Sequence, residues 1–407
     1  MPRGIELPEH SELFDLLVDL TRAGDDPALE TLGTRLEDCD WAKLADLATY
    51  HRVDGLVAAT LLARENWPIP VQWRQHFQER RKDLTFKKVQ NLSASASLSK
   101  LFAASGIRHI LIKGAAISER YYGDTALRQA IDVDIWIAPE DLESAIETLD
   151  LGGFKRPVQA VDIPQKCVGT YRKMVNELSF GKPSPPISLD LHWRLNVNPY
   201  FLPWAFDEIY ERTDRLRIAN TDIPVLNQQD QLINIYTHGA KHAWFRLKWL
   251  ADLYRTKRIL PEDVISASIS AAKSDGSDIM FETGDALFQQ VYERQTPTSS
   301  LPPSMITYMH RMILTPISYD SLSFANFSKL ASELKYKIKL RRELKYKVST
   351  VVHYCLNIND IPVLRLSERF FPVYVILGPV LGVCRMIGRS LDGLRSRSQN
   401  EPNRAEH

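Results

Sequence analysis

The chain has 407 residues, of which 44% are hydrophobic and 25% charged, proportions that exclude disorder along the whole chain. Its 51 Lys and Arg residues nearly balance 50 Asp and Glu residues, so the net charge of +1 excludes a molecule-wide attraction to nucleic acid or membranes. The four cysteines lie far apart without a CxxC pair, which excludes a zinc ribbon or a disulfide framework. Because the N-terminal MPRGIELPEH also lacks the features of a secretion signal, we expect a cytoplasmic protein of two or three domains.

Residues 1–105 predict a helical N-terminal domain. Apolar residues recur at helical spacing over 12–20 and again over 41–62. A long, polar-rich helix is then expected from Val71 to Ala104, just before Gly106.

Residues 106–226 predict an α/β core. IRHILI (107–112) is a β-branched run typical of a strand, and IDVDIWI (131–137) and ISLDLHWR (187–194) alternate strictly between apolar and polar residues. Another strand is expected over 174–180, with KPSPP (182–186) as the turn that follows. We therefore expect an α+β fold, in which a sheet with strands of mixed direction is flanked by helical domains at both ends of the chain.

Helical periodicity returns over 227–330, and a C-terminal extension follows over 331–407. Residues 334–347 contain seven Lys or Arg and one Glu, and their apolar spacing predicts a helix. We interpret its charges first as a solvated face, and second as a dock for an anionic partner. Residues 370–384 are uncharged but too short to cross a bilayer, so we predict no transmembrane span. A buried helix is the first interpretation there, and weak peripheral membrane contact the second.

The pair Asp132 and Asp134 is the sharpest chemical feature of the sequence. On a strand, both side chains project from one face and can share a divalent cation, because Mg²⁺ prefers oxygen ligands and is commonly held by carboxylates plus substrate phosphates. A solvated outer strand face explains the pair equally well. Asp190, on the polar face of a later strand, favours the metal site as a third ligand or a general base. His192 shares its face, and taken alone is better explained as a surface or structural histidine.

Lys113 and Gly114 directly follow the 107–112 strand. A strand, a glycine and a helix start place backbone N–H groups where a phosphate can bind, although glycine serves any tight turn. Arg128, four residues before Asp132, could donate to the same phosphates.

Together these elements resemble the DNA polymerase beta-like nucleotidyltransferase superfamily. Within it, the stretch 111–137 (LIKGAAISERYYGDTALRQAIDVDIWI) followed by LDLHW (189–193) is similar to a bacterial family with KG, R-x3-D-x-D and DLHW elements. The resemblance extends through 227–252, and covers about residues 40 to 255.

The resemblance implies a nucleotidyltransferase-type core and transfer of a nucleoside monophosphate from an NTP, such as ATP, to an acceptor hydroxyl with release of pyrophosphate. Two Mg²⁺ ions would be held by Asp132 and Asp134, with Asp190 as the third acidic position. Lys113, Gly114, Arg128 and His192 would bind the nucleotide. The acceptor, whether a peptide, a small molecule or RNA, stays open, and residues 334–347 would dock the RNA of a toxin-like enzyme.

One departure from the superfamily supports an alternative function. Ala115 follows Gly114 where the superfamily usually has Ser or Gly, so a phosphate-binding hydroxyl is missing. A non-catalytic member that binds a nucleotide or a partner is therefore the alternative. The 18-residue spacing from Gly114 to Asp132 predicts a loop over the site at 123–130.

The helical segment after the core could close over the same cleft. His238 and His242 lie one helical turn apart without an obvious third metal ligand, so structural or substrate-contacting roles are expected. Lys241, Lys248 and Asp252 could line the cleft beside them.

Overall fold

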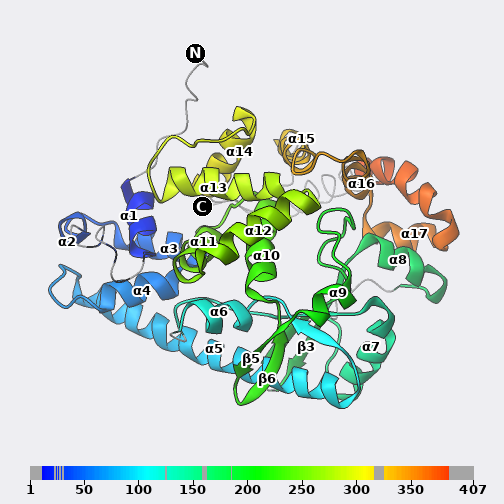
Figure 1. Ribbon diagram of the computed structural model, residues 1–407, viewed down its shortest axis with the longest axis horizontal. Coiled ribbons are helices and arrows are strands. Elements are labelled where there is room, and N and C mark those ends of the chain that lie inside the picture. Colours follow the sequence, from blue (N-terminus) through cyan, green and yellow to red (C-terminus); the bar gives the residue numbers. More distant parts are fainter. Residues whose placement is uncertain are drawn as a thin grey trace, which may run out of the picture.

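The computed structural model describes residues 12–384 except 23, 25, 27–28, 30–31, 124–125, 158–162, 185 and 316–324. It confirms the α+β fold, with a mixed sheet surrounded by helices (Figure 1). None of the four cysteines, all of which lie in the described residues, forms a disulfide. The N-terminal helices are α1 Glu12–Leu20, α2 Leu32–Arg35, α3 Trp41–His51, α4 Asp54–Leu62 and α5 Val71–Ala104.

The core and the C-terminal helices follow in chain order. The core elements are β1 His109–Leu111, α6 Ala115–Tyr121, β2 Val133–Ile137, α7 Leu142–Leu151, α8 Val168–Met174, β3 Glu177–Pro183, β4 Pro186–His192, α9 Phe206–Glu211, β5 Asp214–Ile218 and β6 Thr221–Val225. The later helices are α10 Gln228–Lys241, α11 Leu247–Ile259, α12 Glu262–Asp275, α13 Asp278–Val291, α14 Pro303–Leu314, α15 Ala325–Lys337, α16 Leu344–Cys355 and α17 Ile361–Leu364, and a helical segment over Glu368–Cys384 ends the described chain.

The sheet has the strand order β3-β4-β2-β1-β6-β5. Strand β2 runs parallel to β4, and β1 runs parallel to β6, while the other neighbouring pairs are antiparallel. The expectation of mixed strand directions is therefore confirmed. The parallel register of β2 and β4 places Asp134 directly opposite Asp190.

Successive side chains of β2 and β4 point to opposite faces of the sheet. Val133 and Leu189 face the core formed with α5 and α7. On the opposite face, Trp136 packs against Phe206 of α9 with ring centroids 5.3 Å apart. The expected strand start was wrong at Ile131, which precedes β2 and is 58% exposed, because the chain is still in the preceding loop there.

Helix α5 connects the N-terminal helices to the sheet. In Figure 1 it runs along the lower side of the molecule, and it contacts five of the six strands. One hydrophobic cluster includes side chains from α1, α3 and α4 as well as from α10–α14. The N-terminal and post-core helices therefore pack around a shared interior, and the four domain boundaries stay predictions.

Two segments with continuous helical periodicity are broken in the structure. The 41–62 segment forms α3 and α4, separated at Arg52, whose φ is +55°. The helix predicted over 334–347 was wrong, because α15 ends at Lys337 and α16 begins at Leu344. Between them Arg341 is buried and donates to the carbonyl oxygens of Phe201 and Asp275, which fixes a turn that periodicity does not reveal.

The basic charges of 334–347 are partly paired within the protein. Lys337 lies 2.6 Å from Glu333, and Arg342 lies 2.7 Å from Asp278. Arg341 pairs with Glu343 at 2.8 Å. The segment therefore does not present one continuous basic helix face, and an anionic partner there stays a prediction.

Among the described helices, none is by itself long and apolar enough to cross a membrane. One neighbouring pair, Ile358–Leu364 with Glu368–Cys384, reaches that length and hydropathy only when taken together, and its axes are bent by 109°.

Candidate functional site

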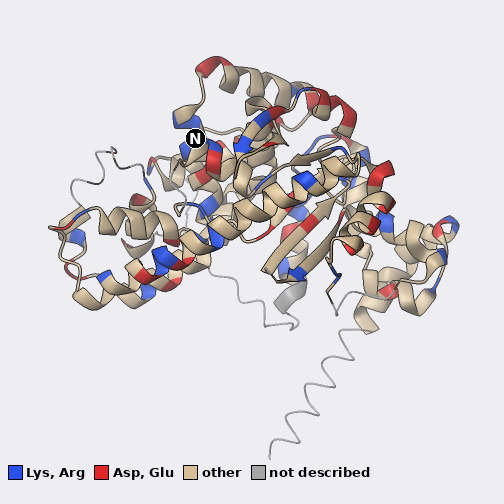
Figure 2. Cartoon of the chain, turned by 90° about the horizontal axis from the view of Figure 1, so that it is seen from below, with Lys and Arg blue, Asp and Glu red and all other residues tan. Residues whose placement is uncertain are grey.

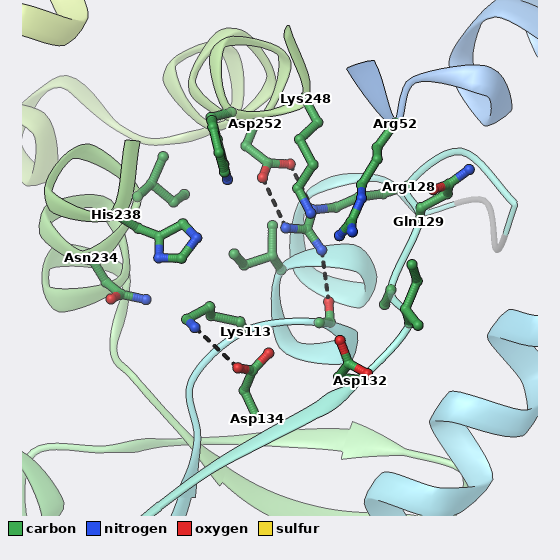
Figure 3. Close-up of a pocket in the computed structure, with 16 residues that line it drawn as sticks. Arg52, Lys113, Arg128, Gln129, Asp132, Asp134, Asn234, His238, Lys248 and Asp252 are labelled. Carbon is green, nitrogen blue, oxygen red and sulfur yellow. Dashed lines mark hydrogen bonds and ion pairs between the residues drawn. The ribbon is translucent and has the colours of Figure 1, made fainter. Parts of the chain in front are cut away.

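A polar pocket of about 160 Å³ lies where β1 ends and β2 begins. Its walls come from three distant parts of the chain: the α3–α4 break, residues 113–134 around the sheet, and helices α10 and α11 (Figure 3). The pocket is lined by Arg52, Lys113, Gly114, Ile117, Arg128, Gln129, Ala130, Ile131, Asp132, Asp134, Asn234, Ile235, His238, Lys248, Trp249 and Asp252.

Gly114 makes the turn from β1 into α6. Its φ of +59° and ψ of −114° are open to glycine and strained for other residues. A Cβ here would also lie 3.2 Å from the carbonyl oxygen of Asp132. The glycine therefore lets the turn approach the backbone that carries the aspartate pair. The adjacent Ala115 is buried and offers no hydroxyl to the pocket.

Asp132 and Asp134 both line the pocket, but their environments differ. Asp134 accepts a hydrogen bond from Lys113 Nζ at 3.0 Å, and the same Oδ1 lies 3.2 Å from His192 Nε2. Burial acts to raise the pKa of Asp134, but Lys113 and His192 outweigh it and hold the pKa well below its usual range. Asp134 is therefore an anion at neutral pH. Asn91 Nδ2 fixes the backbone beside it by donating to the Asp132 carbonyl at 3.1 Å.

His192 lies beneath the pocket rather than in its lining. Its ring is buried between two carboxylates, with Nε2 facing Asp134 and Nδ1 3.0 Å from Glu177 Oε2. Burial lowers the pKa of His192, but the two carboxylates outweigh it and raise the pKa above its ordinary value. Burial likewise acts to raise the pKa of Glu177, but His192 outweighs it and lowers that pKa to about 2. Glu177, His192, Asp134 and Lys113 thus form a row of alternating charges.

Asp190 lies beside Asp134 on the neighbouring strand, outside the pocket lining. It accepts a hydrogen bond from Ser179 Oγ at 2.7 Å. Burial, together with the nearby carboxylates of Asp134 and Glu177, raises the pKa of Asp190 despite that hydrogen bond. Asp190 is thus a better proton acceptor near neutral pH than an ordinary aspartate.

Arg128 is held by a buried, bidentate ion pair. Its Nε and Nη2 donate to the two carboxylate oxygens of Asp252 at 2.6 and 2.9 Å, and Tyr122 donates to the same carboxylate at 2.7 Å. Its Nη1 donates to the Gly114 carbonyl at 3.3 Å. Arg128 therefore ties helix α11 to the glycine turn. The loop expected over 123–130 is present in its described part, since residues 126–130 form neither helix nor strand, while residues 124–125 lie outside the described residues.

The end of the pocket away from the aspartates is cationic. Figure 3 shows Arg52 and Lys248 extending into it from the α3–α4 break and from helix α11, on the side away from Asp132 and Asp134. Lys248 has no hydrogen bond or ion pair with any described residue, and burial together with Arg128 lowers its pKa to about 7. His238 also lines the pocket, and burial together with Lys113 lowers its pKa well below the usual value, so the ring is neutral.

His242 stacks on Trp249 with ring centroids 5.0 Å apart, and His238 lies against both rings. The structural and substrate-contacting roles expected for the two histidines both stay predictions. Lys241 does not line the pocket; burial and Lys113 lower its pKa to about 8.

Residues 37–276 match the model of a protein family described as uncharacterised nucleotidyltransferase. The chain belongs to this family. The matched region contains every residue that lines the pocket, from Arg52 to Asp252. No curated protein and no solved structure matches the chain.

The carboxylates that line this pocket fit a divalent cation that is held in part by substrate. Asp132 and Asp134 offer carboxylate oxygens, the ligands that Mg²⁺ prefers, and Mg²⁺ commonly takes one or two carboxylates plus phosphate oxygens and water. Within the described residues, no group of three His, Cys, Asp or Glu side chains is arranged to hold a metal ion.

Sequence reasoning missed three contributors to this site. Arg52 comes from a helix break that periodicity does not reveal, and no motif marks it. Asn234 lies in α10, where its Nδ2 donates to the Ile112 carbonyl at 3.2 Å. Glu177 begins β3, and only the register of β3 with β4, which pairs it with His192, brings it to the site.

Proposed function

We propose that the protein is a divalent-metal-dependent nucleotidyltransferase that transfers a nucleoside monophosphate from an NTP to an acceptor hydroxyl. The observation that carries the proposal is the single pocket in which a glycine turn, two carboxylates and the cationic Arg52 and Lys248 face one another. The family described above supports transfer chemistry in general. A triphosphate and a divalent cation are the ligands whose charges this pocket complements.

In this proposal the two ends of the pocket contact different phosphates of the nucleotide. Lys113 and the Gly114 turn face the phosphates near the aspartates. Lys248 and Arg52 neutralise the phosphates farther along, where developing charge on pyrophosphate needs preorganised cations. Mg²⁺, when bound to Asp132 and Asp134, would supply Lewis-acid stabilisation of the phosphate oxygens.

At the α-phosphorus, the reaction forms one P–O bond and breaks one. The acceptor oxygen attacks the α-phosphorus, the bond from that phosphorus to the bridging oxygen of the β-phosphate breaks, and pyrophosphate leaves. Asp190, with its raised pKa, takes the proton of the acceptor hydroxyl. His192 acts through Asp134 as a positioning residue because its Nε2 lies 3.2 Å from Asp134 Oδ1, and Glu177 orients His192 from the other ring nitrogen.

Label transfer from each of the four α-³²P-labelled NTPs tests the proposal. Wild-type protein, Mg²⁺ and a lysate of the source cells are expected to yield one labelled acceptor. Asp132→Asn and Asp134→Asn should each lower the rate at least a hundredfold. Asp222→Asn, an exposed aspartate on the β5–β6 hairpin, is the matched control and should leave the rate unchanged. Undiminished transfer by both pocket variants would refute the assigned mechanism.

The alternative is a non-catalytic member that binds a nucleotide. Ala115, which removes a hydroxyl from the glycine turn, is the specific observation in its favour. Metal-dependent stabilisation of the wild type by NTP against heat, without label transfer to any component, would support this alternative.

A further inference from the structure

The last helix of the described chain has an outer face without polar groups. Residues 371–384 (FPVYVILGPVLGVC) contain no charged side chain. The hydroxyl of Tyr374, the clearest polar group among them, is turned inward: it donates to the Leu366 carbonyl at 3.2 Å and accepts the Leu366 N–H at 2.9 Å. Gly378 is buried too, because a Cβ there would collide with the carbonyl group of Cys355. The inward face of the helix is therefore fixed.

The outward face consists of large apolar side chains. Ile376 is 73% exposed and Val380 is 59% exposed, and both project at helical spacing with Val383. A surface helix of a globular protein normally turns a polar face outward, whereas a helix that is apolar all round is buried or meets a membrane. Of the eighteen large apolar side chains that are exposed in the described residues, nine lie between 344 and 383.

The apolar surface continues from this helix onto α16. A groove of about 650 Å³ lies along α16, where Val348 and Val352 line it, and Phe371 is the residue of the last helix that reaches it. Its other lining residues are Lys173, Arg194, Pro199, Tyr200, Leu344, Lys345, Ser349 and His353. Leu344, at the start of α16, is 75% exposed. Figure 2 draws the helices at this end of the molecule mostly without charged residues.

Basic side chains surround this surface and lie over its aromatic rings. Arg369 lies 4.8 Å from the ring of Phe370, Lys173 lies 5.3 Å from Phe371, and Lys345 lies 5.3 Å from Tyr200. The acidic residues of 344–384 are Asp360, which is buried, and Glu368, which pairs with Lys173 at 3.1 Å. An apolar centre with a basic, aromatic margin is complementary to acyl chains beneath anionic headgroups.

We propose that the outer face of Glu368–Cys384, with the adjoining face of α16, docks onto a membrane surface that contains anionic lipids. The helix over 371–384 rises about 21 Å, which is less than the roughly 30 Å of a hydrocarbon core. It therefore lies in the interface rather than crossing it. This inference is independent of the proposed transfer reaction.

Flotation of the full chain with vesicles tests the inference. Wild-type protein is expected to float with phosphatidylcholine vesicles that contain phosphatidylglycerol, and to bind at least tenfold less to phosphatidylcholine alone or at high salt. The double variant Ile376→Glu/Val380→Glu should lose at least tenfold in partitioning. Val71→Glu/Val89→Glu, which adds the same charges at exposed valines of α5, is the matched control and should float like the wild type.

Either of two results would overturn the inference: a wild-type chain that fails to float with anionic vesicles, or a Glu double variant that floats as well as the wild type. In the first case, a wild-type dimer that becomes monomeric with the Ile376→Glu/Val380→Glu change would make this face an interface between copies. Because both side chains are exposed, unchanged melting temperatures should show that each variant is folded.

Discussion

Lys248 offers a direct test of how the pocket binds phosphate. Its pKa is lowered to about 7 by burial and by the guanidinium of Arg128, with Asp252 opposing and Arg52 adding to the effect. A triphosphate beside this amine would raise the pKa of Lys248 again, because a nearby anion favours the charged form of an amine. Nucleotide binding should therefore take up a proton at Lys248.

The size of the effect follows from that pKa. The charged fraction of the free protein falls from about one half at pH 7 to about one tenth at pH 8, so NTP affinity should weaken about fivefold over this interval. Below pH 6 the amine is charged already, and this contribution to the pH dependence should vanish. A hydrogen bond to a charged group contributes about 1.5–3 kcal/mol, so Lys248→Met should weaken binding at least tenfold at pH 6.

Calorimetric titration with a non-hydrolysable NTP at pH 6, 7 and 8 measures this dependence. Lys248→Arg is the matched control, because guanidinium keeps its charge throughout and should bind with little loss between pH 7 and 8. Titration of the nucleotide itself is common to all three proteins and cancels in the comparison. If Lys248→Met keeps the wild-type loss of affinity from pH 7 to 8, the assignment of Lys248 to the phosphates is refuted.

Three further variants probe the framework of the site. Asp252→Asn leaves the buried guanidinium of Arg128 without its anion and should lower the free energy of unfolding by about 3–5 kcal/mol in urea titrations; a loss below 1 kcal/mol would contradict this. Gly114→Ala should abolish NTP-induced thermal stabilisation and lower stability by about 1–3 kcal/mol, because φ is +59° there; NTP stabilisation equal to that of the wild type would count against it. Burial and Arg246 lower the pKa of His51 to about 3, below its unfolded value near 6.5. The unfolded state therefore binds the proton first, and stability should fall by about 1.4 kcal/mol per pH unit below pH 6.5; His51→Asn should reduce that slope, and an unchanged slope would exclude His51 as its source.

Patterns within one segment of the sequence correctly predicted the ends of helix α5 and the faces of strands β2 and β4. Helix α5 begins at Val71 and ends at Ala104 as expected, because proline precedes it and Gly106 follows its end. The alternation in β2 and β4 likewise predicted which side chains share a face, and the parallel register then aligned Asp134 with Asp190.

Tertiary contacts decided the features that the patterns missed. The turn around Arg341 contains no glycine or proline, and its conformation depends on carbonyl groups of Phe201 and Asp275, 140 and 66 residues away. Arg128 stays a predicted phosphate ligand, and its bidentate ion pair with Asp252, 124 residues later, is a contact that no motif indicated. Such pairings depend on how distant elements meet, which the spacing of residues along one segment does not encode.

The pocket is built from three distant parts of the chain, and this limits which segments could be transferred to another protein with the site intact. The predicted α/β core over 106–226 contains both aspartates and the glycine turn, but Arg52 precedes it and Lys248 follows it. A transplanted core would carry acidic groups without the cations that offset them, and Arg128 would lose Asp252. We therefore expect the whole stretch from the α3–α4 break to α11 to be inherited as one unit, and recombination within it to be tolerated poorly.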